Sequence, residues 1–250
     1  MRPSSENPVP ESAKPRDYFA TTHWTMVLHA GRSDSTAARD ALAQLCQAYW
    51  YPLYAYLRRR GHSPEDAEDL TQGFFTRLLE LESLADVRRE KGKFRSFLLA
   101  SLNHYLSDQW DRERAQKRGK GRVVPLEAGG AEARFSREPA DLLTPEKLFE
   151  RKWAMTLLDT VVKKLQREYE SAGKGPLFLA LGFSIAGEKA ETPYSKLSAQ
   201  LGVSEPALRV AAHRLRQRYR RLLRDEIART VATEAEVDGE IQHLYRALAG

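Results

Sequence analysis

Apolar residues recur every three to four positions along most of this chain, which predicts helices and leaves no persistent strand pattern. One amphipathic helix runs through Ala48–Leu57 and stops at Gly61. Another begins at Ser63-Pro64, because a capping serine followed by proline at the first helical position is typical of a helix start. A third starts near Phe94. The pattern predicts an all-α fold.

The clearest local pattern lies in Tyr194–Arg224, which predicts two short helices joined by a tight turn. Gly202 stands where the first helix would end on a left-handed residue. Ser204 is placed to cap the second helix. Pro206 has no backbone N–H, and an N–H at that position would have no partner within the helix. Arginines crowd the second helix outside its apolar stripe. This is the pattern of a helix-turn-helix unit, although a solvated helical hairpin with a basic face remains an alternative.

These patterns divide the chain into two small helical domains joined by a flexible linker. A Gly- and Pro-rich stretch without periodicity separates the helical blocks. The expected segments are a disordered leader (1–22), a first helical domain (23–118), a linker (119–145), a second helical domain with the helix-turn-helix (146–230) and a C-terminal helical extension (231–250). The expected apolar side of the extension comprises Val237, Ile241, Leu244, Tyr245 and Leu248.

The composition and the first residues of the chain predict where the protein is located in the cell. Hydrophobic residues make up 42% of the 250 positions and charged residues 30%, as in globular proteins with a proper core. No run of about 18 apolar residues appears, and the first residues lack the apolar centre of a signal peptide. The single cysteine, Cys46, falls on an apolar helical stripe and is expected in the core. With one cysteine, the chain cannot have an internal disulfide framework. We therefore expect a cytoplasmic protein.

The basic charge is concentrated in two places. The net charge is +6, but residues 88–122 alone carry +7 and residues 205–229 carry +5. Two basic segments about a hundred residues apart indicate two contacts with one polyanion, each strengthened by counterion release. In the first segment, aromatic rings are interleaved with the cations, a combination suited to single-stranded DNA. Phe97 and Tyr105 nevertheless lie on the apolar stripe, where a core position is the commoner outcome.

Three stretches resemble the extracytoplasmic-function class of bacterial RNA polymerase sigma factors. SPEDAEDLTQGFFTRLL (Ser63–Leu79) is similar to the helix that grips the clamp of the polymerase largest subunit. GKFRSFLLASLNHYLSDQWDRERAQKR (Gly92–Arg118) is similar to the helix that melts and reads the minus-ten element. YSKLSAQLGVSEPALRVAAHRLRQRYR (Tyr194–Arg220) is similar to the helix-turn-helix for the minus-thirty-five element. The resemblance implies core RNA polymerase and promoter DNA, duplex and melted, as partners, and admits an anti-sigma protein.

The resemblance also implies three sets of site residues. The expected polymerase-binding residues are Glu65, Asp66, Glu68, Asp69, Gln72 and Phe75. The expected minus-ten residues are Arg88, Arg89, Lys91, Lys93, Arg95, Asn103, Asp108, Trp110, Arg112 and Arg114. The expected minus-thirty-five residues are Ser204, Glu205, Pro206, Arg209, His213, Arg214, Arg216 and Arg220. On charge alone, the acidic set is better interpreted as an ordinary solvated helix face, and only the resemblance favours partner binding.

Two other classes of function remain open. A polymerase-independent helix-turn-helix repressor or activator would use the same C-terminal unit. It would leave the acidic helix (Ser63–Leu79) and the helix that combines aromatic and basic residues (Gly92–Arg118) without a function. An enzyme is the weaker alternative, because the six histidines are scattered and no Gly-rich phosphate loop appears. The acidic helix has no second acidic segment to complete a hard-cation site. We therefore expect no cofactor, no bound metal and no catalytic residue.

Overall fold

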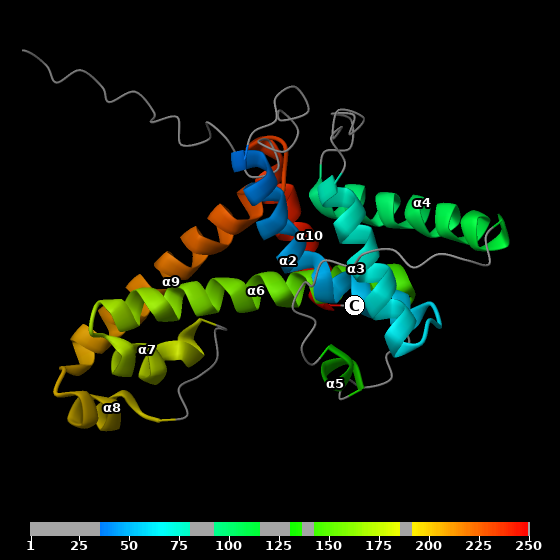
Figure 1. Cartoon of the computed structure of the whole chain (residues 1–250). Helices are drawn as coiled ribbons and strands as arrows, with labels where there is room; N and C mark the ends of the chain where they lie inside the picture. Colours follow the sequence, from blue (N-terminus) through cyan, green and yellow to red (C-terminus); the bar gives the residue numbers. More distant parts are fainter. Residues whose placement is uncertain (1–35, 81–92, 116–130, 137–142, 186–191, 250) are drawn as a thin grey trace, which may run out of the picture.

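The computed structural model describes residues 36–80, 93–115, 131–136, 143–185 and 192–249, and these residues form an all-α fold (Figure 1). The helices of the first block are α2 (Thr36–Arg59), α3 (Pro64–Glu80) and α4 (Phe94–Ala115). The later helices are α5 (Ala131–Ser136), α6 (Pro145–Ser171), α7 (Gly175–Leu181), the short 3-10 helix η3 (Gly182–Ser184), α8 (Tyr194–Leu201), α9 (Glu205–Ala228) and α10 (Ala235–Ala249). The prediction of an all-α fold is confirmed.

The ends of several helices follow the chemistry expected from the sequence. Gly61, just after α2, has a positive φ of 94°. The Ser63 hydroxyl oxygen accepts a hydrogen bond from the Asp66 N–H at 3.1 Å, and Pro64 is the first residue of α3. Gly202 ends α8 in the left-handed conformation, with φ 64° and ψ 25°. A glycine costs little in that region, where a Cβ atom would clash with the backbone.

The predicted serine cap of α9 is only half present. Ser204 has the extended backbone of a capping residue, with φ −62° and ψ 149°, but its side chain makes no capping hydrogen bond. Its carbonyl instead accepts the first helical hydrogen bond, from the Leu208 N–H at 3.0 Å. The start of α9 is therefore defined by backbone geometry and by Pro206, which lies within its first turn.

Helix α6 holds the two helical blocks together. Its most extensive contacts are with α2, and it also packs on α9, α10 and α7. In Figure 1, α7 and α8 lie toward one end of α6 and α3 and α4 toward the other. Buried residues of both blocks belong to one hydrophobic core, in which Tyr49 of α2 meets Phe94 of α4 edge to face and Phe149 of α6. The two blocks expected as separate domains share this core in the described structure.

The segment expected as a linker contains a short helix. In α5, Ala131 is buried and the Glu132 carboxylate accepts hydrogen bonds from the Tyr54 hydroxyl and from Arg58 of α2 at 2.9 and 3.0 Å. The Arg58 and Tyr54 hydrogen bonds lower the pKa of Glu132 from 4.5 to about 2. Residues 131–136, which lie within the expected linker, therefore form a helix that is held against α2.

The C-terminal extension forms α10, which packs on α6 and α9. Val237 and Leu244 are fully buried, and Ile241 and Leu248 are partly buried, as the apolar pattern predicts. Tyr245 differs, because more than half of its surface is exposed. The third fully buried residue of α10 is an acid, Glu240, which occupies the apolar side between Val237 and Leu244.

Candidate polymerase and nucleic-acid interfaces

Four carboxylates form an exposed face on the N-terminal half of α3. Glu65, Asp66, Glu68 and Asp69 are all exposed. Glu65 and Asp66 lie in the first turn, where negative charge interacts favourably with the helix dipole. Asp66 also accepts a hydrogen bond from the Ser63 hydroxyl at 2.8 Å. In the described structure none of these four carboxylates has a cationic partner within ion-pair distance, so the face is free to meet a basic surface.

The other two residues expected in the polymerase-binding set point into the core. Gln72 is 9% exposed and Phe75 is fully buried, packed against the ring of Phe74 at 5.4 Å. The reason is helical register: Thr71 and Phe75 lie one turn apart on a buried side of α3 that also includes Ala67. In this structure these two residues support the acidic face rather than forming part of it.

A groove separates the acidic face of α3 from the polar side of α4. Asp66 and Asp69 line it from α3, and Asn103 and Trp110 line it from α4. The helices approach closely beside it, because a Cβ atom placed on Gly73 would lie only 2.5 Å from the Tyr105 hydroxyl oxygen. The structure thus brings members of two predicted sites to one groove.

Trp110 is the ring best placed for stacking. Its side chain is 70% exposed, in contrast to Phe97 and Tyr105, which are buried as expected. An exposed indole beside a polar groove presents a free face to an unpaired base. Next to it, Asn103 accepts hydrogen bonds from Arg60 at 2.8 Å and from the Tyr56 hydroxyl at 3.1 Å, and Asp108 pairs with Arg77 at 3.5 Å.

Five of the expected minus-ten residues are not characterised by the structure. Arg88, Arg89 and Lys91 lie outside the described residues. Arg112 and Arg114 lie on α4, but their side chains are outside the described set. Their assignment remains a prediction from the resemblance.

Two cations at the start of α4, the buried Arg95 and the partly exposed Lys93, pair with acids of the protein itself. Arg95 is only 6% exposed, and its Nε donates to Glu240 at 2.6 Å. It also pairs with Glu150 of α6 and lies over the Trp153 ring, 5.2 Å from the centroid. Lys93 pairs with the same Glu240 carboxylate at 2.8 Å. In this structure both cations are engaged by Glu240, and their assignment to the minus-ten DNA stays a prediction.

The buried carboxylate and guanidinium stabilise each other's charged forms. Burial alone would raise the pKa of Glu240, but hydrogen bonds and the charges of Arg95 and Lys93 lower it below its ordinary value. Burial likewise opposes the charge on Arg95, and Glu240 and Glu150 raise the Arg95 pKa in spite of it. Both groups remain ionised because each has the other as a partner.

Helix α9 presents a basic outer face. Leu208, Ala212 and Leu215 are buried, and the charged residues between them point outwards. Of the expected contact residues, Pro206, Arg209, His213, Arg214 and Arg220 are exposed, as is Ser204, and Glu205 and Arg216 are partly exposed.

The first turns of α9 hold Arg209 in place. Its guanidinium lies over the Tyr194 ring of α8, 5.2 Å from the centroid, and 3.9 Å from the Glu205 carboxylate. The contact with Tyr194 links the two helices of the unit through the residue expected to reach a base edge.

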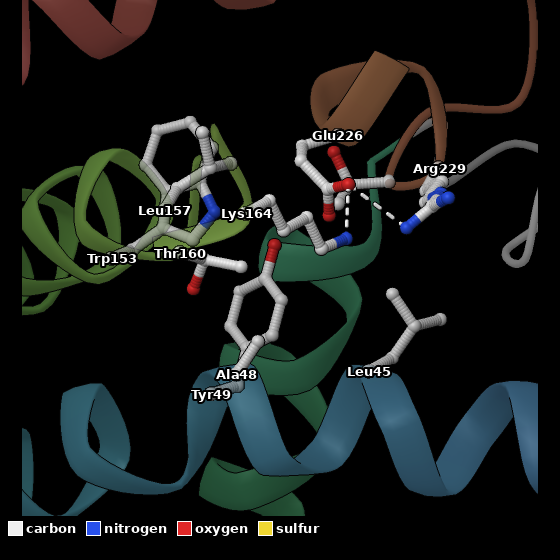
Figure 2. A pocket seen from close by; sticks show the side chains of 10 residues that line it. Leu45, Ala48, Tyr49, Trp153, Leu157, Thr160, Lys164, Glu226 and Arg229 are labelled. Atoms are coloured by element: carbon white, nitrogen blue, oxygen red, sulfur yellow. Dashed lines mark hydrogen bonds and ion pairs between the residues drawn. The ribbon is translucent and has the colours of Figure 1, made fainter. Parts of the chain in front are cut away.

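A pocket lies where α2, α6 and α9 meet (Figure 2). Tyr49 enters from α2, Trp153 and Lys164 from α6, and Glu226 from α9. Glu226 pairs with Lys164 and, at 2.9 Å, with Arg229. The Lys164 pair ties α6 to the end of α9, and the Arg229 pair is local to that end.

Sequence reasoning missed the charged cluster of Glu150, Glu240 and His243. The His243 Nε2 lies 2.7 Å from Glu150, and its ring stands 6.1 Å from that of Trp153. A signal was present for Glu240: it falls three residues after Val237 and four before Leu244, on the apolar side of its helix. An acid at such a position requires a buried cation as partner.

The described residues include neither a membrane-spanning helix nor a cluster of metal-ligating side chains. No described helix is long and apolar enough to cross a membrane. In the described part of the chain, no group of three or more His, Cys, Asp or Glu residues could hold a metal ion.

Comparison with known proteins identifies a family for one segment of the chain. Residues 45–116 match the family model of Sigma-70 region 2, which supports a sigma factor of the sigma-70 family. The matched segment contains all of α3 and α4 and most of α2, and therefore the acidic face, the groove and Trp110. At family level the region implies binding to core RNA polymerase and melting of promoter DNA. No curated protein and no solved structure matches the chain.

Proposed function

We propose that this chain is a sigma factor of the extracytoplasmic-function type, acting in the cytoplasm without catalysing a reaction. It would bind core RNA polymerase, recognise promoter DNA through two separate surfaces and begin strand opening. The observation that carries the proposal is the Sigma-70 region 2 match at residues 45–116, together with the exposed chemistry of that segment.

The proposed polymerase contact is the acidic face of α3. Its four exposed carboxylates would meet a basic or polar surface, and such complementarity accelerates association and fixes orientation. The acids contribute little to folding, since they lie on the surface without ion-pair partners in the described structure. The proposed role of these carboxylates is therefore partner recognition.

The proposed site for the melted strand is the groove between α3 and α4 and the Trp110 ring beside it. An exposed indole can stack on an unpaired base. The cations at the start of α4, Lys93 and Arg95, would follow the phosphates only once their ion pairs with Glu240 open. Capture of an extruded base would favour the opened duplex without nucleotide hydrolysis. Asn103, on the same side of α4, supplies a polar contact.

The proposed duplex contact is the basic face of α9. Arg209, in the first turns, would reach a guanine edge, whereas Arg220, three turns further on, would contact phosphate. The exposed side chains of His213 and Arg214 lie between them. This division of roles gives sequence preference to the first turns of α9 and affinity to the later turns.

The same basic face also fits a polymerase-independent helix-turn-helix regulator. Gel-shift assays on duplex promoter DNA, with and without core polymerase, separate the two functions. A sigma factor forms a specific complex only when core is present, whereas the regulator forms the same complex alone. Binding by the chain alone, unchanged on adding core, would reject the proposal.

A further inference from the structure

The start of α4 is bound to the C-terminal extension by both backbone and side-chain contacts. The Phe94 N–H donates to the Thr230 carbonyl at 3.0 Å, and Lys93 forms an antiparallel bridge with Val231. These contacts place α10 so that the Glu240 carboxylate meets both Lys93 and Arg95. The segment after α9 therefore covers the end of α4 that the proposed function gives to DNA.

The contacts of Glu240 are those that a phosphate would make. One carboxylate group accepts from the Arg95 Nε at 2.6 Å and from its Nη2 at 3.3 Å, and it meets the Lys93 Nζ at 2.8 Å. Arginine and lysine side chains are the usual protein partners of DNA phosphates. Because Arg95 is 6% exposed and Glu240 1% exposed, no phosphate can reach this guanidinium while α10 is in place.

Docking of α10 and engagement of Arg95 by DNA therefore exclude each other. Glu240 cannot remain buried if DNA takes both Arg95 and Lys93, because a buried carboxylate without a cation is strongly unfavourable. Glu150 keeps a second contact with Arg95 and binds His243 of α10, so the guanidinium is held between α6 and α10. The release of Arg95 thus requires α10 to leave its site.

We infer that α10 is an internal competitor of single-stranded DNA: Glu240 occupies Lys93 and Arg95, and strand binding requires α10 to be displaced. This inference rests on the proposed function, since it regulates the same DNA-contacting surface. The described structure is then the closed form. Only the fraction of molecules with α10 displaced binds the strand, which weakens the apparent affinity by that fraction.

The test uses the full chain and a fluorescein-labelled oligothymidylate strand, with binding followed by anisotropy. Glu240→Gln removes the competing charge and should bind the strand at least about tenfold more tightly than the parent. Asp238→Asn is the matched control, because Asp238 lies on the same helix and pairs with Arg224 on the outside. It should bind as the parent does. Adding Arg95→Ala to Glu240→Gln should abolish the gain.

Hydrogen exchange on the unmodified chain tests the inference without relying on a variant that has to fold. Saturating the chain with the strand should deprotect the amides of residues 235–249. Unchanged protection there, or equal affinity of folded Glu240→Gln and parent, overturns the inference. Failure of the parent to bind core polymerase is a separate outcome, which overturns the proposed function instead.

Discussion

The Arg95 guanidinium in the first turn of α4 lies 2.6 Å from the carboxylate of Glu240 in α10, a residue 145 positions further along the chain. The pair is almost wholly buried and joins the Sigma-70 region 2 segment to the C-terminal extension. Arg95 therefore has a structural partner in the free chain, whatever it contacts on DNA.

Replacing Arg95 by alanine should destabilise the fold strongly. The substitution leaves Glu240 buried without its closest cation and removes the guanidinium from the Trp153 ring. Breaking a buried ion pair from one side typically costs about 3–5 kcal/mol. Urea denaturation should report that loss, whereas Arg77→Ala, which removes an exposed pair with Asp108, should change stability by less than about 1 kcal/mol. Similar losses for both variants would contradict a buried pair.

Reversing charge on α3 should abolish polymerase binding while leaving the fold intact. In Glu65→Lys with Asp69→Lys, two exposed carboxylates of the acidic face become cations. Pull-down with core polymerase measures the loss, and circular dichroism checks the helices. Glu170→Lys with Asp225→Lys makes the same change in charge at exposed positions elsewhere and should bind core normally. Equal binding by both double variants would remove the assigned role of α3.

Trp110→Ala should impair strand opening more than duplex binding. The exposed ring makes little contribution to the core, so its loss should affect stacking on an unpaired base. Permanganate footprinting of unpaired thymines on intact promoter DNA should show the deficit, and a pre-melted template should relieve it. Leu179→Ala removes another exposed apolar side chain and serves as the control. If the Trp110→Ala variant opens intact promoter DNA as the parent does, the ring has no role in melting.

Two arginines of α9 should differ in what their loss changes. Arg209→Ala should cost roughly 1–3 kcal/mol of promoter affinity and relax sequence preference at one position. Arg220→Ala should weaken all sites alike and reduce the salt dependence, because a phosphate contact releases counterions whatever the sequence. Competition binding against a library of upstream elements, repeated at several salt concentrations, distinguishes these patterns. Identical patterns for the two variants would refute the division of roles along α9.

The ion pair between α2 and α5 should weaken in acid. The Glu132 pKa falls from 4.5 to about 2 in the folded protein, so its contribution to stability is full above pH 4.5 and is lost as the pH drops toward 2. The carboxylate is partly exposed, which keeps the contribution small. As the pH is lowered between these values, acid unfolding should show a larger loss of stability for the parent than for Glu132→Gln. If the stability of the two proteins falls in parallel, the pair contributes nothing.

The sequence predicted the helices well because their signals are local. The Gly61 turn, the Ser63-Pro64 start and the Gly202 turn each depend on a few neighbouring residues, and each lies where expected. The apolar stripes likewise identified Phe97 and Tyr105 as core residues.

The sequence did not reveal relationships that are distant along the chain. Arg95 was expected to contact the minus-ten DNA, and nothing beside it in the sequence reveals Glu240 as a partner. Gln72 and Phe75 were assigned to the polymerase-binding set by resemblance, and the register of α3 buries both side chains. The helix in residues 131–136 has too few residues to show periodicity and depends on Tyr54 and Arg58 of α2. Composition suggested only a linker there.

The most direct test of the account is promoter opening by the purified chain in the presence of core RNA polymerase. Core with the chain should produce permanganate-reactive thymines in a short segment of promoter DNA, and neither component alone should do so. The Glu65→Lys with Asp69→Lys variant should behave like core alone. If the chain fails to direct core to open any promoter from its own genome, or produces the same DNA complex without core, it does not function as a sigma factor.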